Sequence, residues 1–321
     1  MKINYKQTIS ACFIGYIIQA IVNNFVPLLF VTFQKSYSIE LSKITVLITI
    51  NFVIQLCIDL ASAYFIDKIG YRASALIAHG CSAAGLILLT ILPELLPSAY
   101  AGIVISVIIY AIGGGLLEVL LSPIIEACPT ENKEKAMSLL HSFYCWGHMG
   151  VVLLSTAFFA IFGIENWKAL ALIWAAVPVF NGIFFTRVPI YPLVDEGEKG
   201  LTLKQLAASK TFWIMMLMMV CAGASEQSVS QWVSAFAEEG LGVSKTIGDL
   251  AGPTAFAALM GTSRLIYGKL GHRIDINKFM GFSCVLCIAA YLCISIVQNP
   301  AIELISCAVC GFSVGILWPA T

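Results

Sequence analysis

The feature that most constrains this sequence is a succession of apolar runs, each long enough to cross a membrane. A helix rises 1.5 Å per residue, so about 20 residues span the roughly 30 Å hydrocarbon core of a bilayer. The runs are continuous rather than alternating, and lipid cannot satisfy the edge of an open sheet, so strands are excluded. We therefore predict an all-α integral membrane protein. Its ten predicted spans lie at roughly 7–33, 42–66, 73–96, 98–128, 136–163, 167–186, 211–238, 247–270, 278–297 and 301–321.

Composition favours the same class of protein. Of the 321 residues, 59% are hydrophobic and only 11% are charged, whereas a soluble domain carries about 25% charged residues. Such a chain cannot cover a water-facing surface, so we expect it to be surrounded by a lipid bilayer. The formal net charge is zero, and nothing in it indicates a nucleic-acid partner.

The eleven cysteines give no sign of a redox or metal site. Two pairs, Cys284/Cys287 and Cys307/Cys310, have C-x-x-C spacing, but both pairs lie inside apolar helical runs. In such runs cysteine serves as a small apolar residue. We expect no cofactor and no bound metal.

The Lys and Arg residues predict the orientation. The first run starts from a basic N-terminus, is too long for a signal peptide and lacks a clean cleavage site, so we interpret it as an uncleaved first span. Cytoplasmic loops carry an excess of Lys and Arg. A cytoplasmic N-terminus places thirteen of them inside and four outside, with Arg264 within a span. We therefore expect a multi-pass protein of the plasma membrane with its N-terminus in the cytoplasm.

One polar stretch divides the chain. Residues 187–210 begin with Pro189 and Pro192, carry an acidic patch and end in a short amphipathic run. This composition is typical of a linker followed by an interfacial helix. We predict an N-terminal six-helix half over 1–186, a cytoplasmic linker over 187–210, and a second half over 211–321 that contains helices seven to ten.

The second half repeats features of the first. Internal repeats of six spans are typical of secondary transporters, whose binding site lies between the halves near the midplane. Three pairs of segments correspond in order: 67–72 with 268–273, 115–123 with 311–319, and 19–25 with 226–232.

The stretch AYFIDKIGYR at 63–72 resembles the loop signature of the major facilitator superfamily, G-x-x-x-D-[RK]-x-G-R-[RK]. Asp67, Lys68, Gly70 and Arg72 match the signature, while Ala63 and Tyr71 depart from it, as read from the sequence. The resemblance implies two pseudo-symmetric six-helix halves that transport a solute by alternating access.

Within that superfamily, two further stretches resemble the fucose-permease type of sugar–proton symporter. They are GGGLLEVLLSP at 113–123, where Ser122 replaces the usual Asn, and LLHSFYCWG at 139–147, where His141, Tyr144 and Trp146 replace Gln, Asn and Phe. This resemblance implies a monomeric transporter of a small polar solute, most readily a sugar, with proton symport.

Two departures from this family pattern matter. Symporters of this type often carry an acid on span one, where an ungapped match places Pro27. The family also has twelve spans, whereas this sequence ends in the apolar stretch GILWPAT. We therefore expect spans eleven and twelve to be absent from this sequence, and we expect the 321 residues by themselves not to transport.

Two acids are predicted near the membrane midplane. Glu118 lies ten residues from Cys128, and Glu226 lies about fifteen residues into span seven. A charge in hydrocarbon is costly, so such an acid faces a partner or a water-filled path, or is protonated. We predict that both bind the solute and carry the coupling proton; the alternative is a structural acid paired with a nearby helix. Glu126, near the inner end, is expected to be interfacial.

Other polar residues within the spans are predicted to contact the solute. On span five, His141, Tyr144 and His148 share one helical face with Cys145 and line the pore, or a histidine bonds to a neighbouring helix. An aromatic ring beside amides and a carboxylate suits a sugar. The other predicted contacts are Gln19, Asn23, Asn24, Gln231 and Trp232.

A third group of residues is predicted to act as a conformational latch. Asp59 and Arg264 lie within about two turns of the cytoplasmic ends of the corresponding spans two and eight. We expect these two residues to form contacts between helices that break during alternating access, rather than to bind the solute. The latch also includes Asp67, Lys68, Gly70, Arg72 and Arg273.

Two alternative functions remain open. A proton-coupled exporter of drug-like or amphiphilic compounds is disfavoured by the polar residues within the spans. The other alternative is a non-transporting nutrient sensor, a class of protein that usually has long cytoplasmic tails. An enzyme is least favoured because no nucleophile–base or metal constellation occurs in the sequence.

Overall fold

The computed structural model describes residues 5–130, 133–191, 203–270 and 274–320; some helical side chains, including that of Asp67, are also outside this description. The described residues form helices and turns without a strand. The chain divides into two compact units, Met1–Leu193 and Val194–Thr321. Each unit is described by itself.

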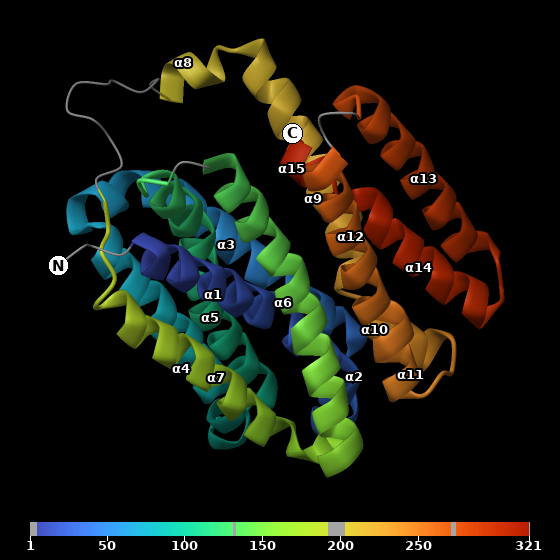
Figure 1. Cartoon of the computed structure of the whole chain (residues 1–321). Helices are drawn as coiled ribbons and strands as arrows, with labels where there is room; N and C mark the ends of the chain where they lie inside the picture. The colour runs from blue at the N-terminus through green and yellow to red at the C-terminus, as the bar shows by residue number, and fades with distance from the viewer. Residues whose placement is uncertain (1–4, 131–132, 192–202, 271–273, 321) are drawn as a thin grey trace. The chain divides into compact units, whose positions relative to one another are not determined.

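The first unit contains seven α-helices (Figure 1). They are α1 (Tyr5–Asn24), α2 (Phe30–Tyr37), α3 (Leu41–Ile69), α4 (Tyr71–Leu95), α5 (Ala99–Glu126), α6 (Lys133–Phe162) and α7 (Trp167–Phe185), with 3-10 turns η1 (Val26–Leu29) and η2 (Ile164–Asn166).

The second unit contains the remaining helices. They are α8 (Leu203–Ala207), α9 (Lys210–Ser230), α10 (Val233–Ala235), α11 (Lys245–Asp249), α12 (Ala255–Leu270), α13 (Ile276–Ile296), α14 (Pro300–Val314) and α15 (Leu317–Ala320), with π-helical turns η3 (Phe236–Gly240) and η4 (Leu250–Thr254).

The helical and membrane-spanning character is confirmed. In the described part of the chain, eight helical segments are long and apolar enough to cross a membrane, and α14 is a shorter apolar helix. The eighth predicted span, 247–270, is built from α11, η4 and α12. Helices therefore occupy all ten predicted spans, although two of them do not reach the length and apolarity of a full span.

The predicted span over 7–33 is confirmed as the apolar helical segment Tyr5–Tyr37, although its α-helix is interrupted. Pro27 lies in the 3-10 turn Val26–Leu29, which separates α1 from α2. Proline has no N–H to continue the α-helical ladder and its ring collides with the preceding turn. Pro253 likewise lies in the π-helical turn η4, which interrupts the span over 247–270.

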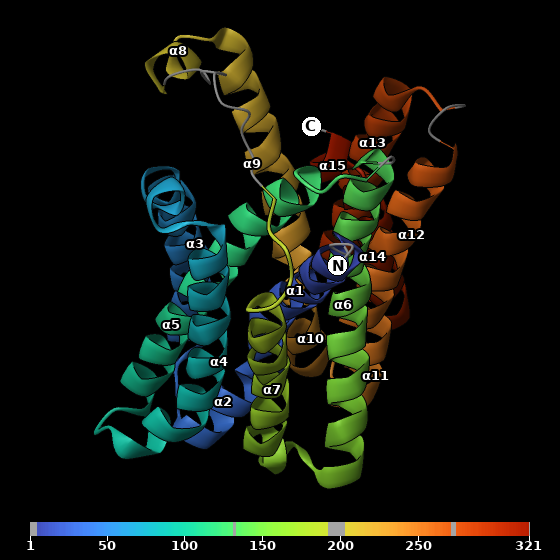
Figure 2. The same ribbon diagram turned by 60° about the vertical axis from the view of Figure 1, so that its left-hand side comes forward.

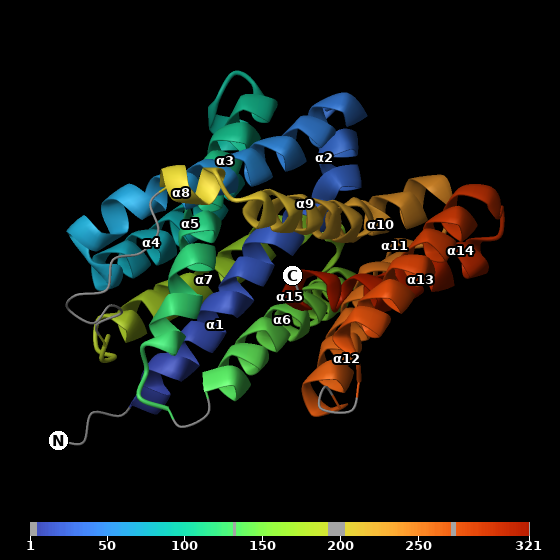
Figure 3. The same ribbon diagram turned by 90° about the horizontal axis from the view of Figure 1, so that it is seen from above.

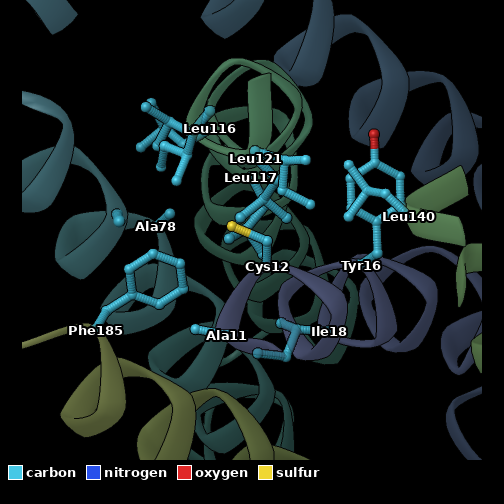
Figure 4. Close-up of a cluster of buried hydrophobic side chains, with 14 of the residues drawn as sticks. Ala11, Cys12, Tyr16, Ile18, Ala78, Leu116, Leu117, Leu121, Leu140 and Phe185 are labelled. Atoms are coloured by element: carbon cyan, nitrogen blue, oxygen red, sulfur yellow. The ribbon is translucent and has the colours of Figure 1, made fainter. Parts of the chain in front are cut away.

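The core of the first unit forms around α1 and α5. Figure 4 shows Cys12 of α1 beside Leu117 and Leu121 of α5, with Phe185 of α7 at the edge of the same cluster. Each side chain is almost fully buried. Close-packed apolar side chains of this kind hold the two helices in a fixed register.

Glycines allow α4 and α5 to lie very close together, side by side in Figure 2. A Cβ built at Gly85 would lie 2.5 Å from the backbone N of Tyr110, and one at Gly113 would lie 2.6 Å from the carbonyl O of Ala78. Small residues at such contacts are how helices approach in membranes.

The second unit has a similar close contact between α12 and α14, which lie beside one another in Figure 1. Figure 3 shows α13 next to α14 in the same unit. A Cβ at Gly311 would lie 2.3 Å from the carbonyl O of Phe256, and one at Gly315 would lie 2.7 Å from that of Met260. These contacts bring α14 against the face of α12 that carries Arg264.

Candidate functional site

Glu118 of α5 is bound by a side chain of α1. Gln19 Nε2 donates a hydrogen bond of 3.1 Å to Glu118 Oε2. Gln19 is buried, whereas Glu118 is half-buried. Both residues were predicted from the sequence as solute contacts, and the structure brings them together.

A ring of three amides lies one turn further along α1. Gln55 Nε2 donates to Asn23 Oδ1 at 2.8 Å and to Asn51 Oδ1 at 3.2 Å. Asn51 Nδ2 donates to Asn23 Oδ1 at 3.4 Å. The three side chains are 3–5% exposed, so this "amide ring" of Asn23, Asn51 and Gln55 is a buried polar cluster between α1 and α3.

Asn51 and Gln55 are not among the site residues predicted from the sequence. A usable signal existed, because the two amides are four residues apart and therefore share a face of α3. Val53, Leu56 and Leu60, on another face of the same helix, are at least half exposed, as suits contact with lipid.

Other predicted residues of α1 and α6 lie nearby in different environments. Asn24 Nδ2 donates to Ala20 O of its own helix. His141 packs its ring at right angles to that of Tyr16, with centroids 5.7 Å apart, and Tyr16 shares a hydrogen bond of 3.2 Å with Ser122 of α5.

The predicted face of α6 lies against α1 at Gly147. A Cβ there would lie 3.1 Å from Ile17 Cα. His148 is 1% exposed, whereas Tyr144 is half-buried. The i, i+7 spacing of His141 and His148 thus places one histidine beside an aromatic ring and the other in the interior of the unit.

A further buried histidine was not predicted. His79 of α4 binds Ala75 O through Nδ1 at 2.6 Å and lies 2.8 Å from Asn181 Nδ2 through Nε2. Asn181 also donates to Ala11 O. Because Asn181 donates, Nε2 accepts and the proton of neutral His79 is on Nδ1. This set joins α1, α4 and α7.

Glu226 of the second unit forms an ion pair. Arg264 Nη2 lies 3.6 Å from Glu226 Oε2, and Arg264 Nε donates to Gly315 O at 2.9 Å. Both side chains are almost completely buried. From the sequence, Glu226 is predicted at the solute site and Arg264 in the latch, whereas the structure pairs them across α9 and α12.

The remaining predicted contacts of the second unit directly follow the end of α9. Gln231 is buried and donates to Gln227 Oε1 at 3.1 Å, and Trp232 is half-buried.

A second charged cluster of this unit was not predicted. Ser234 donates to the fully buried Asp249, and Lys245 Nζ lies 3.3 Å from the same carboxylate.

The predicted latch residues are only partly described. Arg72 donates to the O of Phe185, the last residue of α7, at 2.6 Å and to the O of Val188, three residues further on, at 2.8 Å. Gly70 adopts φ +86°, which favours glycine, and Lys68 is exposed. Asp59 Oδ1 is buried without a hydrogen-bond partner in the described part of the chain. The side chain of Asp67 and all of Arg273 lie outside the described residues.

Among the described residues, no group of three or more His, Cys, Asp or Glu side chains could hold a metal ion. The polar side chains instead bind one another inside units whose helices expose large apolar residues. Apolar spans that enclose hydrogen-bonded amides and carboxylates define a multi-pass membrane protein of the transporter class.

The particular family follows from comparison with known proteins. The family model described as Major Facilitator Superfamily matches residues 12–321, so the chain belongs to the major facilitator superfamily and is a transporter. No curated protein matches the sequence.

Solved structures of two sugar symporters share the fold. The chain resembles the proton:xylose symporter XylE bound to 6-bromo-6-deoxy-D-glucose, with a TM-score of 0.75 at 13% identity, over 98% of this chain and 80% of that one. It also resembles a variant of the E. coli fucose:proton symporter FucP, with a TM-score of 0.69 at 15% identity, over 97% and 82%.

Proposed function

We propose that this transporter carries a small polar solute, most readily a sugar, together with a proton by alternating access. In this proposal it acts as a monomer in the plasma membrane with a cytoplasmic N-terminus, and residues 187–210 form the cytoplasmic linker between the halves. The observation that carries the proposal is the hydrogen bond from Gln19 to Glu118.

The chemistry of this pair suits a hydroxylated ligand. A carboxylate accepts hydrogen bonds, an amide both donates and accepts, and a sugar hydroxyl does both. Glu118 can also exchange a proton, whereas α1 contains no acid. The printed names of the two similar structures, a xylose and a fucose symporter with protons, support the same solute class.

Glu226 is the second proposed proton carrier. Its ion pair with Arg264 stabilises the charged carboxylate, so protonation would weaken the hold of this carboxylate on the guanidinium. In the same proposal Gln231 and Trp232 hold the solute, with the indole ring against the apolar face of a sugar. The residues Asp59, Asp67, Lys68, Gly70, Arg72 and Arg273 keep their proposed latch role.

The test is uptake of a panel of labelled sugars into proteoliposomes of the full-length protein, with and without an inward proton gradient. We expect one sugar or a small group of epimers to accumulate only with the gradient. Equal sugar uptake with and without the proton gradient would contradict proton symport. Proton-driven export of amphiphilic dyes without any sugar uptake would contradict the solute class.

A further inference from the structure

We propose that Asn51 and Gln55 of α3 are positioning residues that fix the amide of Asn23 and thereby set which sugar epimer is accepted. The inference rests on the proposed function, because it concerns the specificity of that same site. Neither residue belongs to the solute contacts predicted from the sequence.

The hydrogen bonds of the amide ring couple the orientations of its three members, and in the structure Asn23 Oδ1 is the acceptor shared by Gln55 and Asn51. Gln55 Nε2 has two hydrogens, and its two acceptors are Asn23 Oδ1 and Asn51 Oδ1. Asn51 Nδ2 then donates to Asn23 Oδ1. If the Asn23 amide alone were turned over, its N–H groups would face the donors of Gln55 and Asn51. The ring therefore holds the Asn23 oxygen inward and directs its N–H groups away from α3.

The close approach of α5 to α3 leaves little room for Gln55 to rearrange. A Cβ at Gly115 would lie 3.0 Å from Gln55 Cα, and one at Gly114 would lie 3.4 Å from Gln55 Nε2. These two glycines precede Glu118 by about one turn. The same stretch of α5 thus packs against the amide ring and carries the carboxylate.

The ring and the carboxylate together define a pattern of donors and acceptors. Gln19 and Asn23 are four residues apart, about 6 Å along one face of α1. Gln19 binds the Glu118 carboxylate, an acceptor, while the oriented Asn23 presents a donor. A sugar that places one hydroxyl for each group is accepted, and an epimer with one hydroxyl inverted loses a hydrogen bond.

The first experiment measures uptake kinetics of the Gln55→Leu protein, which removes two of the three ring bonds. A lost hydrogen bond changes affinity by about fivefold, so KM should rise and epimer discrimination should fall by about that factor, with little change in maximal rate. In an Asn23→Ala background, Gln55→Leu should change KM no further. Leu56→Ala, on the exposed face of α3, is the matched control and should leave both values unchanged.

An equal effect of Gln55→Leu in both backgrounds, or none in either, would overturn the inference. If Gln55→Leu does not fold, Asn51→Leu replaces it in the same cycle. Thermal unfolding without sugar supplies a readout independent of transport. The decreases in unfolding temperature caused by Asn23→Ala and by Gln55→Leu should not add up in the double variant. If these decreases add up while the wild-type protein transports sugar, this inference is overturned and the proposed function is not. A wild-type protein that takes up no sugar overturns the proposed function, and this inference with it.

Discussion

Gln19 Nε2 and Glu118 Oε2, 3.1 Å apart, join α1 to α5 in the interior of the first unit. This hydrogen bond lowers the free-energy cost of placing the carboxylate inside a membrane-spanning segment, since a buried polar group needs a partner. The same bond restrains Gln19, which stands one turn from the amide ring.

The first prediction concerns the titration of Glu118. The Glu118→Gln protein keeps a carbonyl oxygen that can accept from Gln19 but cannot bind a proton at neutral pH. We expect it to exchange labelled for unlabelled solute across the membrane, because exchange needs no net proton movement. We expect it to lose accumulation driven by a proton gradient, measured in proteoliposomes.

The exposed Glu126, at the end of the same helix, supplies the control. Glu126→Gln should retain both exchange and accumulation. If Glu118→Gln still accumulates solute against a gradient, the coupling proton is elsewhere, with Glu226 and His148 as the remaining candidates. Loss of both activities together with poor folding would instead indicate a purely structural acid.

The second prediction concerns the buried ion pair of the second unit. Arg264→Met leaves the Glu226 carboxylate without its guanidinium partner, and an unpaired buried charge costs about 3–5 kcal/mol of stability. The double change Glu226→Gln with Arg264→Met removes both charges and should regain much of that loss. Thermal unfolding in detergent, followed by tryptophan fluorescence, measures both proteins.

Lys278→Met removes an exposed cation in the first turn of α13 and serves as the control, with little expected effect. A double variant less stable than Arg264→Met would show that Glu226 does not depend on this partner. An unchanged single variant would mean that the pair contributes nothing measurable, as many exposed pairs do.

The helices were predictable from the sequence because their signal is local. A run of about 20 apolar residues specifies a spanning helix whatever surrounds it. Glu118 could be recognised as a site residue because an acid inside such a run is costly and therefore needs a reason. The helix break at Pro27 also has a local signal, since proline cannot continue the helical ladder. It was not predicted because the residues on both sides of Pro27 form one apolar run.

The partners of the polar residues were not predictable, because they depend on tertiary packing. Glu226 and Arg264 are 38 residues apart in the sequence, and the contact exists only where α9 and α12 meet. Asn51 and Gln55 were missed because their helix reads as a uniform apolar run. Their four-residue spacing indicates a shared helical face, but that this face is buried against α1 is seen only in the structure.

The third prediction concerns orientation, which rests on the thirteen-to-four distribution of Lys and Arg. We expect a cysteine at the exposed Ala208 to react with a membrane-impermeant maleimide from the cytoplasmic side. A cysteine at the exposed Ser98, which directly precedes α5, should react from the outside. Both are measured in intact cells and inverted vesicles, in a background whose native cysteines do not react. Labelling of Ala208→Cys only in intact cells would reverse the predicted orientation.

The last prediction concerns the close approach of α4 and α5, where two glycines of one helix make a matched pair. A Cβ at Gly85 would lie 2.5 Å from the backbone N of Tyr110 and 2.9 Å from Ser106 O, whereas one at Gly80 meets nothing within 4 Å. Backbone atoms cannot move aside as a flexible side chain can, so Gly85→Ala must push the helices apart. Overpacking of this kind costs about 1–3 kcal/mol.

Both changes add the same methyl group to the same helix, where alanine is the better helix former. The Gly80→Ala protein should therefore unfold at the wild-type temperature or slightly above it, while Gly85→Ala should unfold at a clearly lower temperature in detergent. Equal unfolding temperatures for the two variants would contradict the close contact. The displacement should also reach Glu118, because α5 carries both the Tyr110 backbone and that carboxylate; solute uptake by Gly85→Ala should fall more than the loss of folded protein explains.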